Sequence, residues 1–88
     1  MTATASTRAR RATVRALVTP ASPGATVVLQ LRLRDRFGWW PVARAKVGGD
    51  GRATLVVPVG RRVPARVVLT LADGATQLAR TPAFSVGR

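Results

Sequence analysis

Turn-forming residues interrupt this chain at short intervals, and this spacing restricts its fold more than any other feature. Clusters with Gly, Pro, Asp or Ser occur at 19–25, 35–38, 48–51, 59–64, 72–75 and 81–82. The segments between them are short, rich in Val, Leu and Thr, and lack a sustained helical period of apolar residues. The pattern is typical of antiparallel β-sandwiches and barrels. We expect strands near 12–19, 25–35, 39–48, 52–59, 65–72 and 75–86.

The second and third predicted strands carry their apolar residues at odd positions. These are Val27, Leu29, Leu31 and Leu33, followed by Trp39, Ala43, Ala45 and Val47. A three-residue loop at 36–38, with Gly38 in the left-handed region, would join the two strands as a hairpin. This loop would set Asp35 opposite Trp39, Leu31 opposite Ala43 and Leu29 opposite Ala45. Large and small side chains would then alternate across the buried face.

The later turns extend the same register argument. A three-residue loop at 49–51 would set Val47 opposite Ala53, Ala45 opposite Leu55 and Ala43 opposite Val57, on the same buried face. A two-residue turn at Asp73 and Gly74 would set Leu69 opposite Leu78. Because that register continues with Arg80 pointing inward, we expect a bulge or break between Ala79 and Pro82.

The adjacent tryptophans must have different roles, because neighbouring residues on a strand point to opposite faces. Trp39 has the parity of the apolar residues, so we predict that it lies in the core. Trp40 has the other parity and would lie on a basic face opposite Arg34, as a contact surface or a shielded surface aromatic.

Residue content restricts the chemistry of the chain. The 88 residues suit one domain, and they include no cysteine, no histidine and only three carboxylates, Asp35, Asp50 and Asp73. Each carboxylate lies in a turn context, where a short polar side chain bonds its own backbone. No phosphate-binding loop, nucleophile motif or metal-ligand constellation is present in the sequence. We expect no enzymatic activity, no catalytic residue, no metal and no cofactor.

Charge is the other extreme property. The formal net charge of +12, from 15 Lys and Arg against three Asp, favours an anionic partner. Two origins of this charge stay open, a binding function and the compositional bias of a GC-rich coding sequence. The first twelve residues lack the apolar run of a secretory leader, and no apolar stretch is long enough to span a bilayer. We therefore expect no membrane insertion.

Part of the chain resembles a known class of domain. A strand with Val27, Leu29 and Gln30, then Trp39, then 42–45 (VARA) and 50–51 (DG), occur in this order. The run resembles the immunoglobulin-like, fibronectin-type sandwich repeats of bacterial secreted and cell-surface proteins, over about half of the chain. The resemblance implies an immunoglobulin-like antiparallel β-sandwich of six to seven strands with an adhesive, spacer or assembly role. It favours the cell surface, the extracellular space or a virion-like assembly over the cytoplasm.

Two functions follow as hypotheses. In the first, residues 12–88 form the sandwich and residues 1–11 form a basic arm that joins protein subunits, either further copies of this chain or an acidic scaffold. Its partner contacts would be Arg8, Arg10, Arg11 and Trp40. In the alternative, the chain binds a polyanion such as nucleic acid, weakly and without sequence preference, through Arg32, Arg34, Arg44 and Lys46, with Trp40 stacking on a base.

Overall fold

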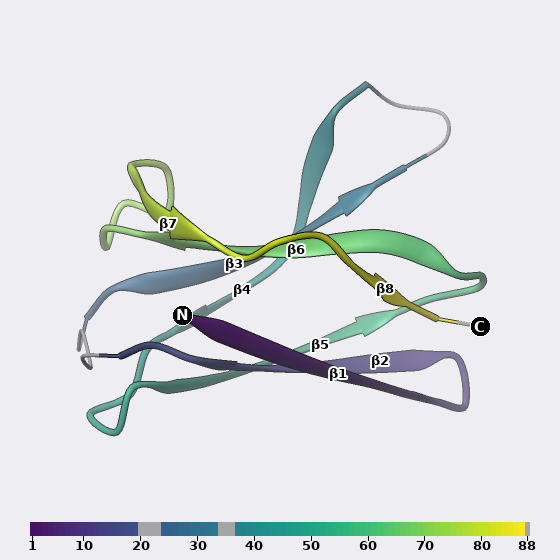
Figure 1. Cartoon of the computed structure of the whole chain (residues 1–88), viewed down its shortest axis with the longest axis horizontal. Coiled ribbons are helices and arrows are strands. Elements are labelled where there is room, and N and C mark those ends of the chain that lie inside the picture. The colour runs from purple at the N-terminus through teal and green to yellow at the C-terminus, as the bar shows by residue number, and fades with distance from the viewer. Residues whose placement is uncertain (20–23, 34–36, 88) are drawn as a thin grey trace.

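A computed structural model describes residues 1–19, 24–33 and 37–87 and places eight strands among them, with no helix. The strands are β1 (Thr2–Arg8), β2 (Arg11–Leu17), β3 (Thr26–Arg32), β4 (Trp39–Lys46), β5 (Arg52–Pro58), β6 (Val63–Thr70), β7 (Gln77–Arg80) and β8 (Phe84–Val86). They form a three-stranded sheet in the order β1-β2-β5 and a five-stranded sheet in the order β4-β3-β6-β7, in which β8 also pairs with β6. The two sheets lie as separate layers (Figure 1). The predicted all-β fold of antiparallel strands is confirmed, with eight strands rather than six or seven.

The core lies between the layers and is built by alternation along the strands. In the three-stranded sheet every second residue of β2 and β5 is buried: Ala12, Val14, Ala16, Ala53, Leu55 and Val57. The five-stranded sheet contributes Val27, Leu29 and Leu31 from β3 and Ala65, Val67 and Leu69 from β6. Each set has the period of two expected when one face of a strand packs on another layer.

The predicted basic arm is instead largely a strand of the domain. Residues 2–8 form β1, which pairs with β2 from Thr2 opposite Leu17 to Arg8 opposite Arg11. The two turn residues Ala9 and Arg10 have positive φ values of 52° and 62°, as a tight hairpin turn requires. Such turns usually contain Gly or Asn, so this one carried no recognisable turn signal. Its conformation is held from outside, since Val59 N donates to the Arg10 carbonyl oxygen (2.8 Å).

The hairpin of β3 and β4 is confirmed, but its predicted register is wrong. Leu29 pairs with Ala43 and Val27 with Ala45, two residues away from the expected partners. A register shift beyond Leu29 then leaves Val42 as an extra residue on β4, next to Pro41, which has no N–H for a ladder. Gly38 is left-handed as expected (φ 71°). Asp35, predicted to face Trp39, lies outside the described residues.

The predicted hairpin of β4 and β5 is also wrong. The chain crosses at Val47–Gly51 from one sheet to the other, and β5 pairs with β2, so that Leu55 lies opposite Val14 rather than Ala45. Val47 and Leu55 are buried as predicted. Alternation correctly identified the buried face but does not distinguish a hairpin from a connection between sheets, because both direct the same residues inward.

The last connection combines a wrong register with a confirmed break. Leu69 pairs with Ala79 rather than Leu78, and Leu71 N bonds the Thr76 carbonyl, so the loop is longer than a two-residue turn. The expected interruption is present, since β7 ends at Arg80 and β8 begins at Phe84, with both strands paired to β6. Arg80 is exposed and does not enter the core.

A candidate polyanion-binding face

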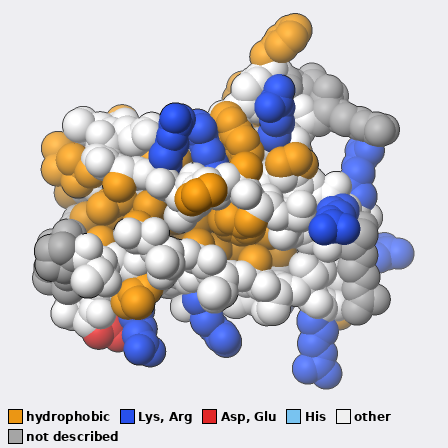
Figure 2. Space-filling model, in the orientation of Figure 1, with side chains coloured by type: hydrophobic (Ala, Val, Ile, Leu, Met, Phe, Trp, Pro, Cys, Tyr) orange, Lys and Arg blue, Asp and Glu red, His pale blue; other side chains and the backbone are white. Residues whose placement is uncertain are grey.

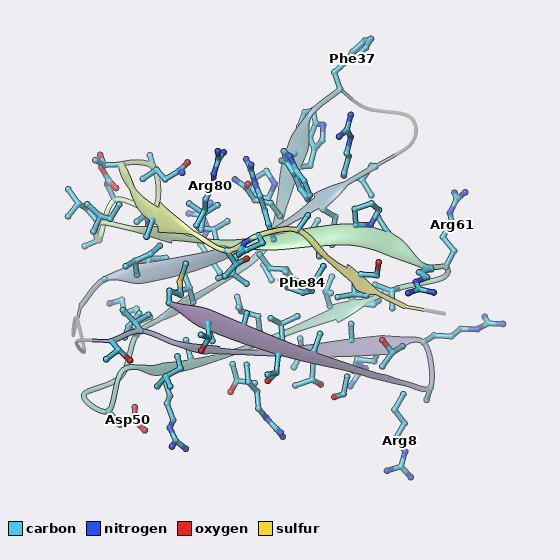
Figure 3. The ribbon with its side chains drawn as sticks, in the orientation of Figure 1. Arg8, Phe37, Asp50, Arg61, Arg80 and Phe84 are labelled. Carbon is cyan, nitrogen blue, oxygen red and sulfur yellow. The ribbon has the colours of Figure 1, made fainter. Side chains whose placement is uncertain are left out.

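Cationic side chains gather on the outer face of the five-stranded sheet. The register sets Arg44, Val28, Val68 and Arg80 side by side across β4, β3, β6 and β7, on the face opposite to the core residues of β3. Side chains on alternate positions of these strands share this face. We call it the basic face, and its cations are Arg32, Arg44, Lys46, Arg66 and Arg80. Arg80 points outward from the upper layer in Figure 3, and Lys and Arg side chains line this side of the molecule in Figure 2.

Arg66 is held on the basic face by two side-chain contacts. Its Nε donates to Gln30 Oε1 on the neighbouring strand (2.7 Å), and its guanidinium carbon lies 4.6 Å from the centre of the Trp39 ring. Burial, and to a smaller extent the positive charge of Arg80, lower the pKa of Arg66 below its usual value. The guanidinium stays charged at neutral pH because its pKa starts so high. Repulsion between Arg66 and Arg80 is therefore present in the free protein, and a bound anion would relieve it.

Two apolar residues of the basic face are fully covered. Val28 and Val68 are 3% and 2% exposed, although neither belongs to the core cluster between the sheets. Their cross-strand neighbours in the ladder are Arg44 and Arg80. Long arginine side chains can cover apolar surface with their methylene groups while the charged ends stay in water. The face thus has a packed apolar layer beneath charged ends.

Neither tryptophan has the position predicted for it. Trp39, predicted in the core, lies on the basic face opposite Arg32 and beneath Arg66. Trp40, predicted on the basic face, pairs with the buried Leu31 and donates from Nε1 to the Phe37 carbonyl (3.0 Å). The extra residue Val42 inverts the parity of the strand before it, and parity counted from Ala43 is wrong beyond that point. Trp40 keeps 39% of its surface exposed, so it is not a core residue either.

The predicted polyanion residues are brought together in part. Arg32, Arg44 and Lys46 share the basic face, while Arg34 lies outside the described residues, as does its expected contact with Trp40. Arg66 and Arg80 were missed, and so was the place of Trp39. Arg66 alternates with the buried Ala65 and Val67, so strand parity could have identified it. No sequence signal places Arg80 on this face, because its direction depends on the register shift between β6 and β7.

The predicted partner-binding arginines lie at one end of the sandwich. Arg8, Arg10 and Arg11 are exposed at the turn between β1 and β2, and not on a free arm. Figure 3 shows Arg8 at the same end as Arg61 of the β5–β6 loop, while Asp50 lies at the opposite end. These residues form a second positively charged region at this end, where Arg61 lines one pocket together with Arg32 of the basic face. Trp40 lies on β4 and does not join them.

The described carboxylates are bound to their own loops, as predicted. Asp50 Oδ1 accepts a hydrogen bond from Arg52 N (3.1 Å). Asp73 accepts from the Thr76 hydroxyl (2.6 Å) and from Ala75 N and Thr76 N (2.9 and 3.0 Å). These bonds, the hydroxyl first, lower the pKa of Asp73 to about 2. In the part of the chain that the structure describes, no carboxylate therefore lies on a strand of the basic face.

Within 1–19, 24–33 and 37–87, no group of three or more His, Cys, Asp or Glu side chains could hold a metal ion. The same residues contain no helix that is long and apolar enough to cross a membrane. No protein-family model matches the chain, and neither curated proteins nor solved structures provide a match.

Proposed function

We propose that this chain is a non-catalytic, immunoglobulin-like binding module that holds nucleic acid by its phosphate backbone against the basic face. One observation carries the proposal: five cations share one sheet face, and the described carboxylates lie in loops. Neighbouring strands are about 5 Å apart and alternate residues about 7 Å apart, so the cations cover a patch of roughly 15 Å across the strands and roughly 20 Å along them. Such a patch can contact several phosphates of one strand.

The contacts on the basic face favour backbone binding over base recognition. The Trp39 ring stacks with Arg66, and Gln30 Oε1 accepts the Arg66 hydrogen bond, so both side chains are already held by contacts within the sheet. Phosphate contacts position a nucleic acid but carry no sequence information. The module would therefore bind without sequence preference, and its affinity would depend strongly on salt.

The test measures binding of a fluorescent single-stranded oligonucleotide by anisotropy over a range of salt concentrations. If all five cations contact phosphates, log K should fall with log salt with a slope of about −3.5, from about −0.7 per contact. The double variant Arg44→Gln/Arg80→Gln should reduce the steepness by about 1.4. Arg66 is left unchanged because its bonds also support the sheet.

A matched control removes the same charge from the other sheet. Arg15 and Arg52 are exposed on the outer face of β2 and β5, so Arg15→Gln/Arg52→Gln lowers the net charge by two without touching the basic face. The control should keep the wild-type slope. Equal losses in the two double variants would show that net charge alone drives binding, and absence of salt-dependent binding would remove the proposal altogether.

The assembly role predicted from the sequence is a second candidate. It no longer rests on a free arm, because residues 2–8 are paired within the chain. It is favoured instead by the exposed edge of β1, which pairs only with β2 among the described strands.

A further inference from the structure

The edge strands of the two sheets differ in how well they are protected. Natural proteins shield edges with short strands, prolines, bulges and charges. The β4 edge carries Pro41, the bulge at Val42, Arg44 and Lys46, and the β7 edge is four residues long. β5 ends in Pro58 and begins with Arg52. β1 has seven residues, no proline, no register shift and no charge before Arg8.

The flank beside β1 also leaves apolar surface uncovered. The sheet of β1, β2 and β5 is three strands wide and faces a sheet that is four strands wide. β1 is an edge strand of the narrower sheet. Ala5 is exposed although its partner in the ladder is the buried Val14. Apolar side chains are visible between the two layers on this flank in Figure 2, and Phe84 lies there in Figure 3. Phe84 and Ala79 are only partly buried, and Leu78 is 52% exposed.

We propose that two copies of this chain associate through antiparallel pairing of their β1 strands. With Ala5 on the two-fold axis, the full strands overlap, Thr2 lies opposite Arg8, Ala3 opposite Thr7 and Thr4 opposite Ser6. The pairing is self-complementary, as a two-fold interface requires, and sets no like charges opposite each other. The added strand presents Ala3, Ala5 and Thr7 to the uncovered apolar flank, because these residues share the face of the buried Ala16, Val14 and Ala12.

Charge decides in favour of a second copy as the occupant. Copies with a net charge of +12 can approach only where their cations stay apart. The first six residues of β1 carry no charged side chain, and the basic face lies on the outer side of the other sheet. An acidic partner would instead be attracted to the arginine-rich face and end. Up to Gly87, where the described part of the chain ends, the C-terminal segment pairs with β6 and not with β1, and Gly87 N bonds the Thr7 side-chain Oγ1 (2.9 Å).

The experiment is sedimentation velocity over a concentration series in moderate salt, with wild type expected to show a monomer–dimer equilibrium. Ala5→Lys and Ala5→Glu each place like charges at the two-fold axis and should weaken dimerisation by about tenfold. An equimolar mixture of the two variants should restore the dimer, because Lys then faces Glu. Thr54→Lys adds a charge to the exposed outer face of β5 and should dimerise as wild type does.

Hydrogen exchange provides a readout that does not depend on the variants folding. Dilution of wild type should reduce amide protection in β1 and leave β5, which is paired only with β2, unchanged. A wild type that is monomeric at every concentration would overturn the proposal. Unimpaired dimers of Ala5→Lys, an equal loss in Thr54→Lys, or no recovery in the mixture would do the same. None of these results affects the proposed nucleic-acid site, which lies on the other sheet.

Discussion

Buried and exposed residues alternate regularly along the strands of one sheet of this molecule and irregularly along those of the other. The β1-β2-β5 sheet has no register shift, and in β2 and β5 inner residues are buried and outer ones largely exposed. The β4-β3-β6-β7 sheet has two register shifts and buries residues on both faces, Val28 and Val68 among them. Side-chain parity therefore predicts which way a side chain points only within an uninterrupted ladder that has one face in water.

The outer face of each sheet explains this difference. Outer residues of β2 and β5, such as Arg15 and Val56, stand in solvent without a covering layer. On the basic face the outer valines Val28 and Val68 are removed from water, and we attribute this to the long cationic side chains of their ladder neighbours Arg44 and Arg80. The positions that carry the proposed function also carry part of the stability of this sheet.

The largest expected effect on the free energy of unfolding comes from replacing a tryptophan of the bulged strand β4. Trp39→Ala should lower the free energy of unfolding by about 2 kcal/mol, from lost partial burial and the stacking with Arg66. Trp40→Ala should cost about 1 kcal/mol, since Trp40 is 39% exposed. Urea denaturation measures both values. A loss for Trp39→Ala in the range of roughly 3–5 kcal/mol, as for a core aromatic, would contradict its place on the outer face.

The contrast between the outer faces is tested by one valine from each. Val28→Ala should lower the free energy of unfolding by about 1.5 kcal/mol, because two buried methyl groups are lost beside the arginines. Val56→Ala on the three-stranded sheet should change stability by less than about 0.5 kcal/mol, since Val56 is 49% exposed. The two chemically identical truncations, compared by thermal or urea unfolding, would cost the same if the basic face had no packed layer.

The smallest expected effect is the loss of stability at low pH that comes from Asp73. The folded-state pKa of Asp73 is lowered to about 2, so its carboxylate contributes stability that is fully present above about pH 4 and lost as the pH falls through about 2. Asp73→Asn lacks this contribution. The difference in urea midpoint between wild type and Asp73→Asn should therefore narrow between about pH 5 and pH 2. A difference that stays constant over this range would show that the loop bonds do not favour the ionised form.

The sequence by itself determined the all-β class, most turn positions and the buried faces of β3 and β5, because these follow from local turn chemistry and a period of two. It also identified Arg32, Arg44 and Lys46 as sharing a face. It did not identify β1, since Ala9 and Arg10 form a turn without Gly or Asn, or the pairing of β5 with β2.

Only the tertiary structure decided which strands pair and where ladders slip. Hydrophobic alternation says which side of a strand is buried, but the choice of partner depends on contacts between residues distant in sequence. The bulge at Val42 places Trp39 on the basic face instead of in the core, and the register shift between β6 and β7 places Arg80 opposite Val68 on the same face. Arg66 and Gln30, 36 residues apart, meet only because β3 and β6 are neighbours in the sheet.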